Sequence, residues 1–161
     1  MILVVYATKH GSTREVAEAV AETLRDEGLD VEVREAAETR SLDRYDGVVL
    51  GGALYMGRWH RDAKRFLSRH RAALATMPVA VFAMGPRTLE EQDVAESRTQ
   101  LDRALAEAPE LEPVSVAIFG GVIDPAAQHF PFNRMAATDA RDWDAIRAWA
   151  RELARSLAVP A

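Results

Sequence analysis

The order of hydrophobic and polar residues predicts five β-strands. Three runs, at residues 2–7, 48–50 and 79–83, are apolar without interruption, which is typical of strands buried on both faces. Two other segments, at residues 31–34 and 114–119, alternate apolar and polar positions, as half-exposed strands do. Because edge strands of a parallel sheet are less buried than central ones, we expect the two alternating segments at the edges.

Helical spacing of apolar residues fills the intervals between these strands. Helices are predicted over about residues 12–27, 60–76 and 88–108, and a final helix begins at Asp142 and Trp143. Strands that alternate with helices favour an α/β fold with a doubly wound, five-stranded parallel sheet in the order 2-1-3-4-5. No repeat or linker interrupts the pattern, so residues 1–161 are expected to form a single domain.

Composition narrows the classes of function. The 161 residues carry a net charge of −5, which disfavours nucleic acid and anionic membranes as partners, although residues 58–71 are locally basic. Without cysteine, the chain can form no disulfide, thiolate nucleophile or cysteine-held metal site. No signal peptide pattern and no apolar run of membrane-spanning length is present, so a cytoplasmic location is expected.

The six residues after the first strand, Thr8 to Thr13, are the strongest candidate for a binding site. They hold hydroxyl groups, a lysine, a histidine and a glycine directly before a helix, where free N–H groups and the helix dipole attract anions. This composition predicts a phosphate site. The alternative is an ordinary helix start, because Ser12 and Glu15 have the spacing of a capping box.

Two other segments are expected at the same edge of the sheet, since ligands of such folds bind beyond the carboxyl ends of the strands. These are residues 51–59, after the third strand, and residues 84–87, after the fourth. Response-regulator receivers share the strand order but need carboxylates in these positions to hold magnesium. The segments 6–8 and 51–53 contain none, which excludes a receiver.

The pattern Thr8-x-x-Gly11-x-Thr13 resembles the phosphate loop of flavodoxins. Further segments are similar to the menaquinone-dependent protoporphyrinogen oxidase branch of the flavodoxin-domain family, and the basic insertion of that branch is represented only by a shorter stretch at residues 124–141. The similar segments are Gly57-x-x-His60, Phe66-x-x-x-His70, Met77-Pro78 and Asp142-Trp143.

The resemblance implies FMN as the cofactor, and it assigns no catalytic residue and no metal ligand. Tyr55 is expected to stack on the flavin ring, with Trp59 as the rival, and Gly57 to turn its peptide toward the ring. Fully stated, the implied cofactor-binding residues are Thr8, Lys9, His10, Gly11, Ser12, Thr13, Ala53, Leu54, Tyr55, Met56, Gly57, Trp59, Met84, Gly85, Pro86 and Arg87.

Three functions are compatible with these residues. The first is an electron carrier that meets a redox partner protein, and the second is an oxidoreductase that passes electrons from a small-molecule substrate to a quinone. The third is a flavin-free domain with a phosphate- or sulfate-binding loop. The stretch 124–141, with Phe130, Phe132 and Met135, either packs on the protein or meets a partner. His70, on an apolar helix face, is expected to be a core-edge histidine rather than a ligand.

Overall fold

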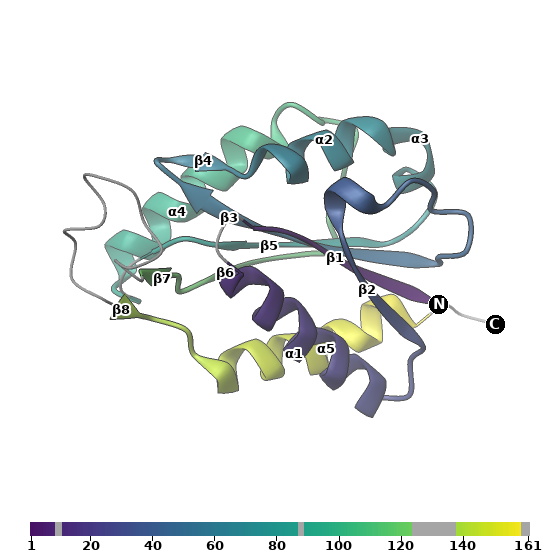
Figure 1. Ribbon diagram of the computed structural model, residues 1–161, viewed down its shortest axis with the longest axis horizontal. Helices are drawn as coiled ribbons and strands as arrows, with labels where there is room; N and C mark the ends of the chain where they lie inside the picture. The colour runs from purple at the N-terminus through teal and green to yellow at the C-terminus, as the bar shows by residue number, and fades with distance from the viewer. Residues whose placement is uncertain (9–10, 87–88, 124–137, 159–161) are drawn as a thin grey trace.

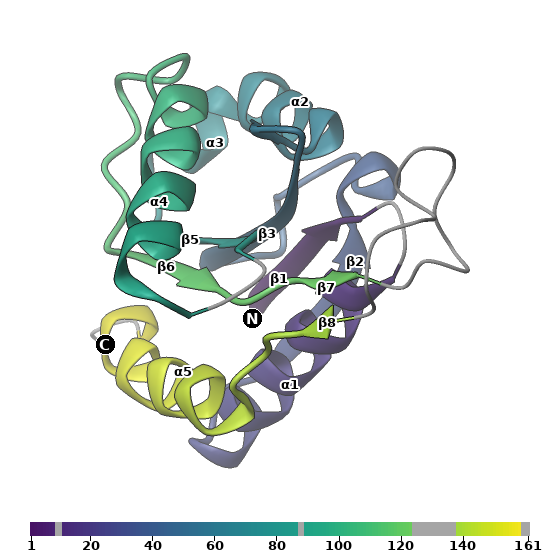
Figure 2. The ribbon, with the colours of Figure 1, turned by 90° about the vertical axis from the view of Figure 1, so that its left-hand side faces the viewer.

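The structure is a computed structural model that describes residues 1–8, 11–86, 89–123 and 138–158. A parallel sheet lies between two layers of helices, with α1 and α5 on one face and α2, α3 and α4 on the other (Figure 1; Figure 2). The elements are β1 (Ile2–Ala7), α1 (Ser12–Asp26), β2 (Val31–Glu35), the 3-10 turn η1 (Ala36–Glu38), β3 (Gly47–Tyr55), β4 (Arg58–Trp59), α2 (Arg61–Arg69), α3 (Arg71–Leu74), β5 (Val79–Met84), α4 (Glu91–Leu105), β6 (Ser115–Phe119), β7 (Val122–Ile123), β8 (Thr138–Asp139) and α5 (Trp143–Leu157).

The predicted topology is confirmed. The main strands lie in the order β2-β1-β3-β5-β6 and pair in parallel, which is 2-1-3-4-5 when these five are counted along the chain. The alternating strands β2 and β6 occupy the edges, as predicted. Two short additions lie outside this order: β4 pairs antiparallel with β3, and β7 pairs with β8.

Strand β1 shows how the apolar runs build two cores. All six of its residues are buried, and alternate side chains point to opposite faces of the sheet. Ile2, Val4 and Tyr6 join the core under α1 and α5, whereas the residues between them join the core under the other helices. A continuous apolar run is therefore the sequence signature of a strand that is covered on both sides.

The predicted second helix is wrong in one respect, because it is two helices. His70 has φ −106° and ψ 21°, which ends α2 before α3 begins at Arg71. The side chain of His70 is buried, packs against Phe66 and contacts the carbonyl of Thr39 through Nε2 at 3.2 Å, in agreement with its predicted place at the edge of the core.

The prediction that the third strand ends at residue 50 is also wrong. Strand β3 continues to Tyr55 and turns back into β4. Gly51 and Gly52 serve close packing instead: a Cβ on Gly51 would lie 2.0 Å from Cζ of Phe82, and one on Gly52 would lie 2.5 Å from Nε1 of Trp59. Of the predicted irregular stretch 124–141, residues 124–137 lie outside the described part of the chain.

Candidate functional site

Three segments meet beyond the carboxyl ends of the central strands. The register places Ala7 beside Gly52 and Ala53 beside Met84, so β1 and β5 end on either side of β3, near its carboxyl end. In Figure 1 these three strands run toward the left, so their carboxyl ends lie on the left-hand side of the sheet. Of the predicted site residues, Lys9, His10 and Arg87 lie outside the described residues.

The segment after β1 leaves the N-terminus of α1 open. Gly11 precedes the helix in a left-handed conformation, with φ 87°, and as a glycine it supplies no side chain to cap the first turn. Thr8 closes the turn, since its Oγ1 accepts a hydrogen bond from the N–H of Gly11 at 3.1 Å. The first N–H groups of an α-helix have no acceptor within the helix, so they are available to a ligand.

The predicted alternative of a capping box is wrong. Ser12 is already the first helical residue, so its hydroxyl does not occupy the position that caps a helix. The Glu15 carboxylate pairs with Nη1 of Arg141 at 2.7 Å, an ion pair that joins α1 to the segment before α5. The helix start therefore has none of the internal hydrogen bonds that a capping box would supply.

Thr13 carries the most informative polar group of the site. Its side chain is fully buried, and its Oγ1 has no hydrogen-bond partner among the described residues. Leaving a buried hydroxyl without a partner costs about 1–3 kcal/mol. The other buried threonines donate to carbonyl oxygens: Thr23 to Ala19 and Thr39 to Glu35. An acceptor placed at the helix start would satisfy Thr13, and a phosphate oxygen has the charge and the chemistry to do so.

The segment after β3 is a tight hairpin with an apolar tip. Met56 and Gly57 both have positive φ, 51° and 78°, as the two central residues of a type I′ turn require. Leu54 pairs with Trp59 and Tyr55 with Arg58 on either side of the turn. Met56 is 72% exposed and Tyr55 is 36% exposed, so the hairpin presents both side chains at the surface.

The two aromatic candidates for ring stacking have different environments. Trp59 is 2% exposed, belongs to the core under α2 and donates its Nε1–H to the carbonyl of Gly52 at 3.0 Å. A ring in this position has no free face, so the interpretation of Trp59 as a stacking residue does not fit this conformation. Tyr55 is the exposed aromatic of the pair.

The segment after β5 packs against this hairpin. Met84 and Pro86 are buried, and a Cβ on Gly85 would lie 2.7 Å from Cδ1 of Leu54. The backbone is held by neighbours, with the N–H of Gly85 bonded to the carbonyl of Phe119 and the N–H of Gly121 to that of Pro86. The second and third predicted segments therefore form one contiguous surface.

Helix α4 adds polar residues that the sequence-based reasoning missed. A pocket of about 250 Å³ separates the hairpin from α4, and Asp93, Glu96, Ser97 and Gln100 line its helical side. Their spacing of three and four residues places them on one helix face, which was a signal available from the sequence. The sides facing the strands are formed by Leu54, Met56, Gly57, Gly85 and Pro86.

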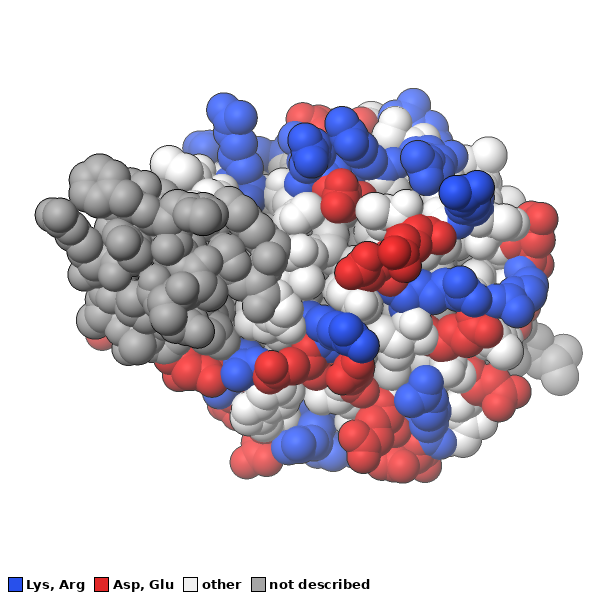
Figure 3. Space-filling model, in the orientation of Figure 1, with Lys and Arg blue, Asp and Glu red and all other residues white. Residues whose placement is uncertain are grey.

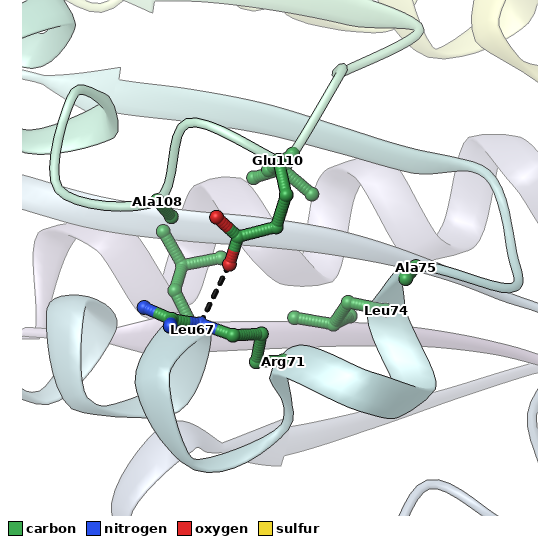
Figure 4. A pocket seen from close by; sticks show the side chains of 7 residues that line it. Leu67, Arg71, Leu74, Ala75, Ala108 and Glu110 are labelled. Carbon is green, nitrogen blue, oxygen red and sulfur yellow. Dashed lines mark ion pairs between the residues drawn. The ribbon is translucent and has the colours of Figure 1, made fainter.

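A second pocket lies elsewhere, between α2, α3 and the segment after α4. Leu67, Leu74 and Leu111 are among its lining residues, and an ion pair between Arg71 and Glu110 at 2.6 Å spans it (Figure 4). Its volume of about 10 Å³ corresponds to roughly one water molecule. It is a packing defect rather than a ligand site.

Three further findings on the described residues concern metal binding, membrane spans and the ionisation of Tyr6. They include no group of three or more histidine, aspartate or glutamate side chains arranged to hold a metal ion. Within the same residues, no helix has the length and apolar content of a membrane span. Tyr6, at the end of β1, is buried, and this burial raises the pKa of its phenol, so the group is neutral near pH 7.

Comparison with known proteins gives one consistent family. Residues 3–131 match the model of the flavodoxin domain. The oxidised flavodoxin 1 of Bacillus cereus shares 18% identity, with a TM-score of 0.65 over 98% of this chain and 99% of that chain. The flavodoxin of Streptococcus pneumoniae TIGR4 shares 21% identity, with a TM-score of 0.62 over 98% and 97% of the two chains.

Curated relatives of this chain carry the name protoporphyrinogen IX dehydrogenase (quinone). The protein of Escherichia coli K12 is 30% identical over 84 residues, which cover 51% of this chain and 46% of that protein. The protein of Leishmania major is 26% identical over 179 aligned positions, which cover 98% of this chain and 77% of that protein. The match to the Escherichia coli protein thus spans just under half of that protein's length.

Proposed function

The chain belongs to the flavodoxin domain family, and on that premise we propose that it is an FMN-binding redox protein that mediates electron transfer. The observation that carries the proposal is the buried Oγ1 of Thr13, which lacks a partner among the described residues and lies at an open helix N-terminus. A monophosphate ester at this place would accept hydrogen bonds from the hydroxyl and from the first N–H groups of α1.

The first segment would hold the phosphate. Thr8 keeps its hydroxyl proton free to donate, because its Oγ1 serves as an acceptor for Gly11. The left-handed Gly11 presents no side chain, and among the described residues beyond its chain neighbours no atom lies within 4 Å of where a Cβ would stand, so a ligand could approach closely. Ser12 and Thr13 follow with further donors, and Lys9 and His10 complete the proposed set.

The second and third segments would hold the ring. Tyr55, which is 36% exposed, would stack on the ring, and Gly57, with φ 78°, would present its backbone peptide to it. Residues 84–87, with Gly85 among them, would meet either the polar edge of the ring or the ribityl chain. When bound, the flavin supplies one- and two-electron redox chemistry, and the protein tunes it by stacking, hydrogen bonds and charge.

The proposal is tested by titrating the flavin-free protein with FMN and with riboflavin. The two ligands share the ring and differ in the phosphate, so the phosphate site predicts tighter binding of FMN. Equal affinity for both ligands would remove the role assigned to Thr13 and its neighbours. A protein that takes up neither ligand would favour the flavin-free reading of the loop.

A second candidate function is supported by the two protoporphyrinogen IX dehydrogenases that the chain resembles. In this alternative, the protein oxidises an organic substrate and passes the electrons to a quinone. A steady-state assay of the FMN-loaded protein with porphyrinogen and menaquinone decides between the two. Negligible turnover supports the electron carrier, whereas robust turnover supports the oxidoreductase.

A further inference from the structure

The outer face of α2 carries a row of arginines that no part of the fold explains. Arg61, Arg65 and Arg69 are exposed and recur every four residues, which places them along one side of the helix over about 12 Å. Arg58, on β4, is also exposed and extends the row toward the hairpin. We call these four residues the α2 arginine row.

The α2 arginine row differs from the neighbouring basic residues in its ion pairs. Lys64 pairs with Glu107 at 3.4 Å and Arg71 with Glu110 at 2.6 Å, so both are used in packing α2 and α3 against the segment after α4. The four residues of the row form no ion pair with any other described residue. Lys and Arg side chains gather along the upper edge of the molecule, over β4, α2 and α3 (Figure 3). This positive surface exists although the chain as a whole carries a net charge of −5.

The row is continuous with the hairpin that belongs to the proposed flavin site. Arg58 pairs with Tyr55 across the hairpin, and Met56 at the tip, 72% exposed, is the most exposed large apolar side chain of the described residues. Aromatic residues, methionine and arginine are the types enriched in protein–protein interfaces, with charged residues at the rim. The tip and the row together have this composition: an apolar centre beside the proposed cofactor and a cationic flank.

We propose that this surface docks an acidic protein that exchanges electrons with the chain, an inference that rests on the proposed function. A protein partner needs only a local patch of carboxylates to meet the row, and the pairing would steer the two molecules together with the hairpin at the contact. Nucleic acid and an anionic membrane are extended negative surfaces, and both would also face the acidic remainder of this chain.

The test uses cytochrome b5, an acidic haem protein, as the probe. One electron passes from the photochemically reduced, flavin-loaded protein to the ferric haem iron, which becomes ferrous, and stopped-flow absorbance gives the second-order rate at low and high salt. The variant R61E/R65E/R69E reverses the row at three exposed positions. We expect its rate at low salt to fall at least tenfold and the difference to disappear at high salt.

Helix α5 provides a matched control. Arg147, Arg151 and Arg155 are exposed, have the same spacing and lie on the opposite side of the sheet. R147E/R151E/R155E changes the net charge by the same amount, so a rate within about twofold of the wild type shows that position, not total charge, matters. Equal losses in both triple variants would overturn the proposal. Salt-independent rates in the wild type would do the same.

Two further measurements separate the remaining outcomes. Sedimentation with vesicles containing phosphatidylserine tests whether the row binds an anionic membrane. If R61E/R65E/R69E loses vesicle binding but keeps the wild-type rate with cytochrome b5, the proposal of a protein partner is overturned. Titration with FMN is made for every variant. If the wild type takes up no flavin, the proposed function fails, and salt-dependent binding of the flavin-free protein to cytochrome b5 still decides the docking surface.

Discussion

Helices α1 and α5 have 15 residues each and cover the same face of the sheet, yet they begin in different ways. The side chain of Asp142 caps α5, where Oδ1 accepts a hydrogen bond from the N–H of Ala145 at 3.0 Å. The start of α1 has only Gly11, whose lack of a side chain leaves the first turn uncapped. An ion pair between Glu15 and Arg141 links the two starts, so they share one neighbourhood of the protein.

The start of α5 shows how this fold satisfies a helix N-terminus that serves stability alone. One aspartate suffices to satisfy a helix start, and such a cap contributes about 1 kcal/mol. At α1, the chain instead places a hydroxyl in a buried position without a described partner, at Thr13, and a glycine in a left-handed conformation. The hydroxyl without a partner weakens the flavin-free protein and would become favourable when it binds an anion. The glycine adopts the left-handed conformation without steric cost and leaves the helix start without a side chain. We therefore attribute the difference between the two starts to a ligand.

The largest expected effect comes from Thr13→Val, which removes the hydroxyl and keeps the shape. We expect FMN to bind about 30-fold more weakly, equivalent to about 2 kcal/mol for a hydrogen bond to a charged group. The flavin-free protein should gain about 1 kcal/mol of unfolding free energy, because a buried polar atom without a partner is lost. Flavin fluorescence titration and urea unfolding measure the two quantities.

Thr23→Val is the matched control, since Thr23 is a buried threonine in the same helix whose hydroxyl already donates to Ala19. It should leave the affinity for FMN unchanged and should not stabilise the protein. A Thr13→Val variant that binds FMN like the wild type would contradict the ligand as the cause of the open helix start.

Gly11→Ala should have the next largest effect. Apart from the chain neighbours of Gly11, no described atom lies within 4 Å of the added Cβ, so the cost is conformational, about 1–2 kcal/mol for a left-handed residue. Gly28, which follows the end of α1 with φ 94°, is equally free of neighbours and provides the control. Both alanine variants should lose similar stability in urea, whereas only Gly11→Ala should weaken FMN binding. Weaker FMN binding in both would show that general stability, not the first segment, controls affinity.

Asp142→Ala tests the capped start of α5, with which the start of α1 was compared. Loss of the cap should reduce the unfolding free energy by about 1 kcal/mol, because the N–H of Ala145 loses its acceptor. The affinity for FMN should stay within about twofold of the wild type. Together with Thr13→Val, this variant gives opposite changes in stability, and a loss of stability in both would mean that the hydroxyl of Thr13 has an internal role.

Much of this arrangement was predictable because it depends on local patterns. The apolar runs identify buried strands, and the alternating segments identify edges, since burial on one or two faces acts directly on the sequence. The choice between a cap and an open helix start depends on a single position. If Ser12 preceded the helix, it would cap it, but Ser12 is the first helical residue, and composition does not decide between these cases.

The hairpin could not be predicted because its causes are distant in sequence. Gly51 and Gly52 indicate a loop by composition, but they are small so that Phe82 and Trp59 can pack against β3. The same packing buries Trp59 and leaves Tyr55 exposed, although both are aromatic residues of one segment. Only the register of β3 with β4 distinguishes Trp59, a core residue, from Tyr55, a candidate for the flavin site.

The smallest expected effect concerns His70, a buried polar group that has a partner inside the fold. Burial lowers the pKa of its imidazole below 6.5, and the positive charge of Arg69 acts in the same direction, while the hydrogen bond to Thr39 opposes them. The unfolded chain then binds more protons than the folded one below about pH 6.5, so this contribution to stability is complete above that pH and is lost as the pH falls. His70→Gln has no titrating ring, and its unfolding free energy should decline less than that of the wild type between pH 7 and pH 5. Its affinity for FMN should follow the wild type at every pH, because His70, at the end of α2, is not one of the proposed cofactor-binding residues. A parallel decline of stability in both proteins would assign the pH dependence to other groups.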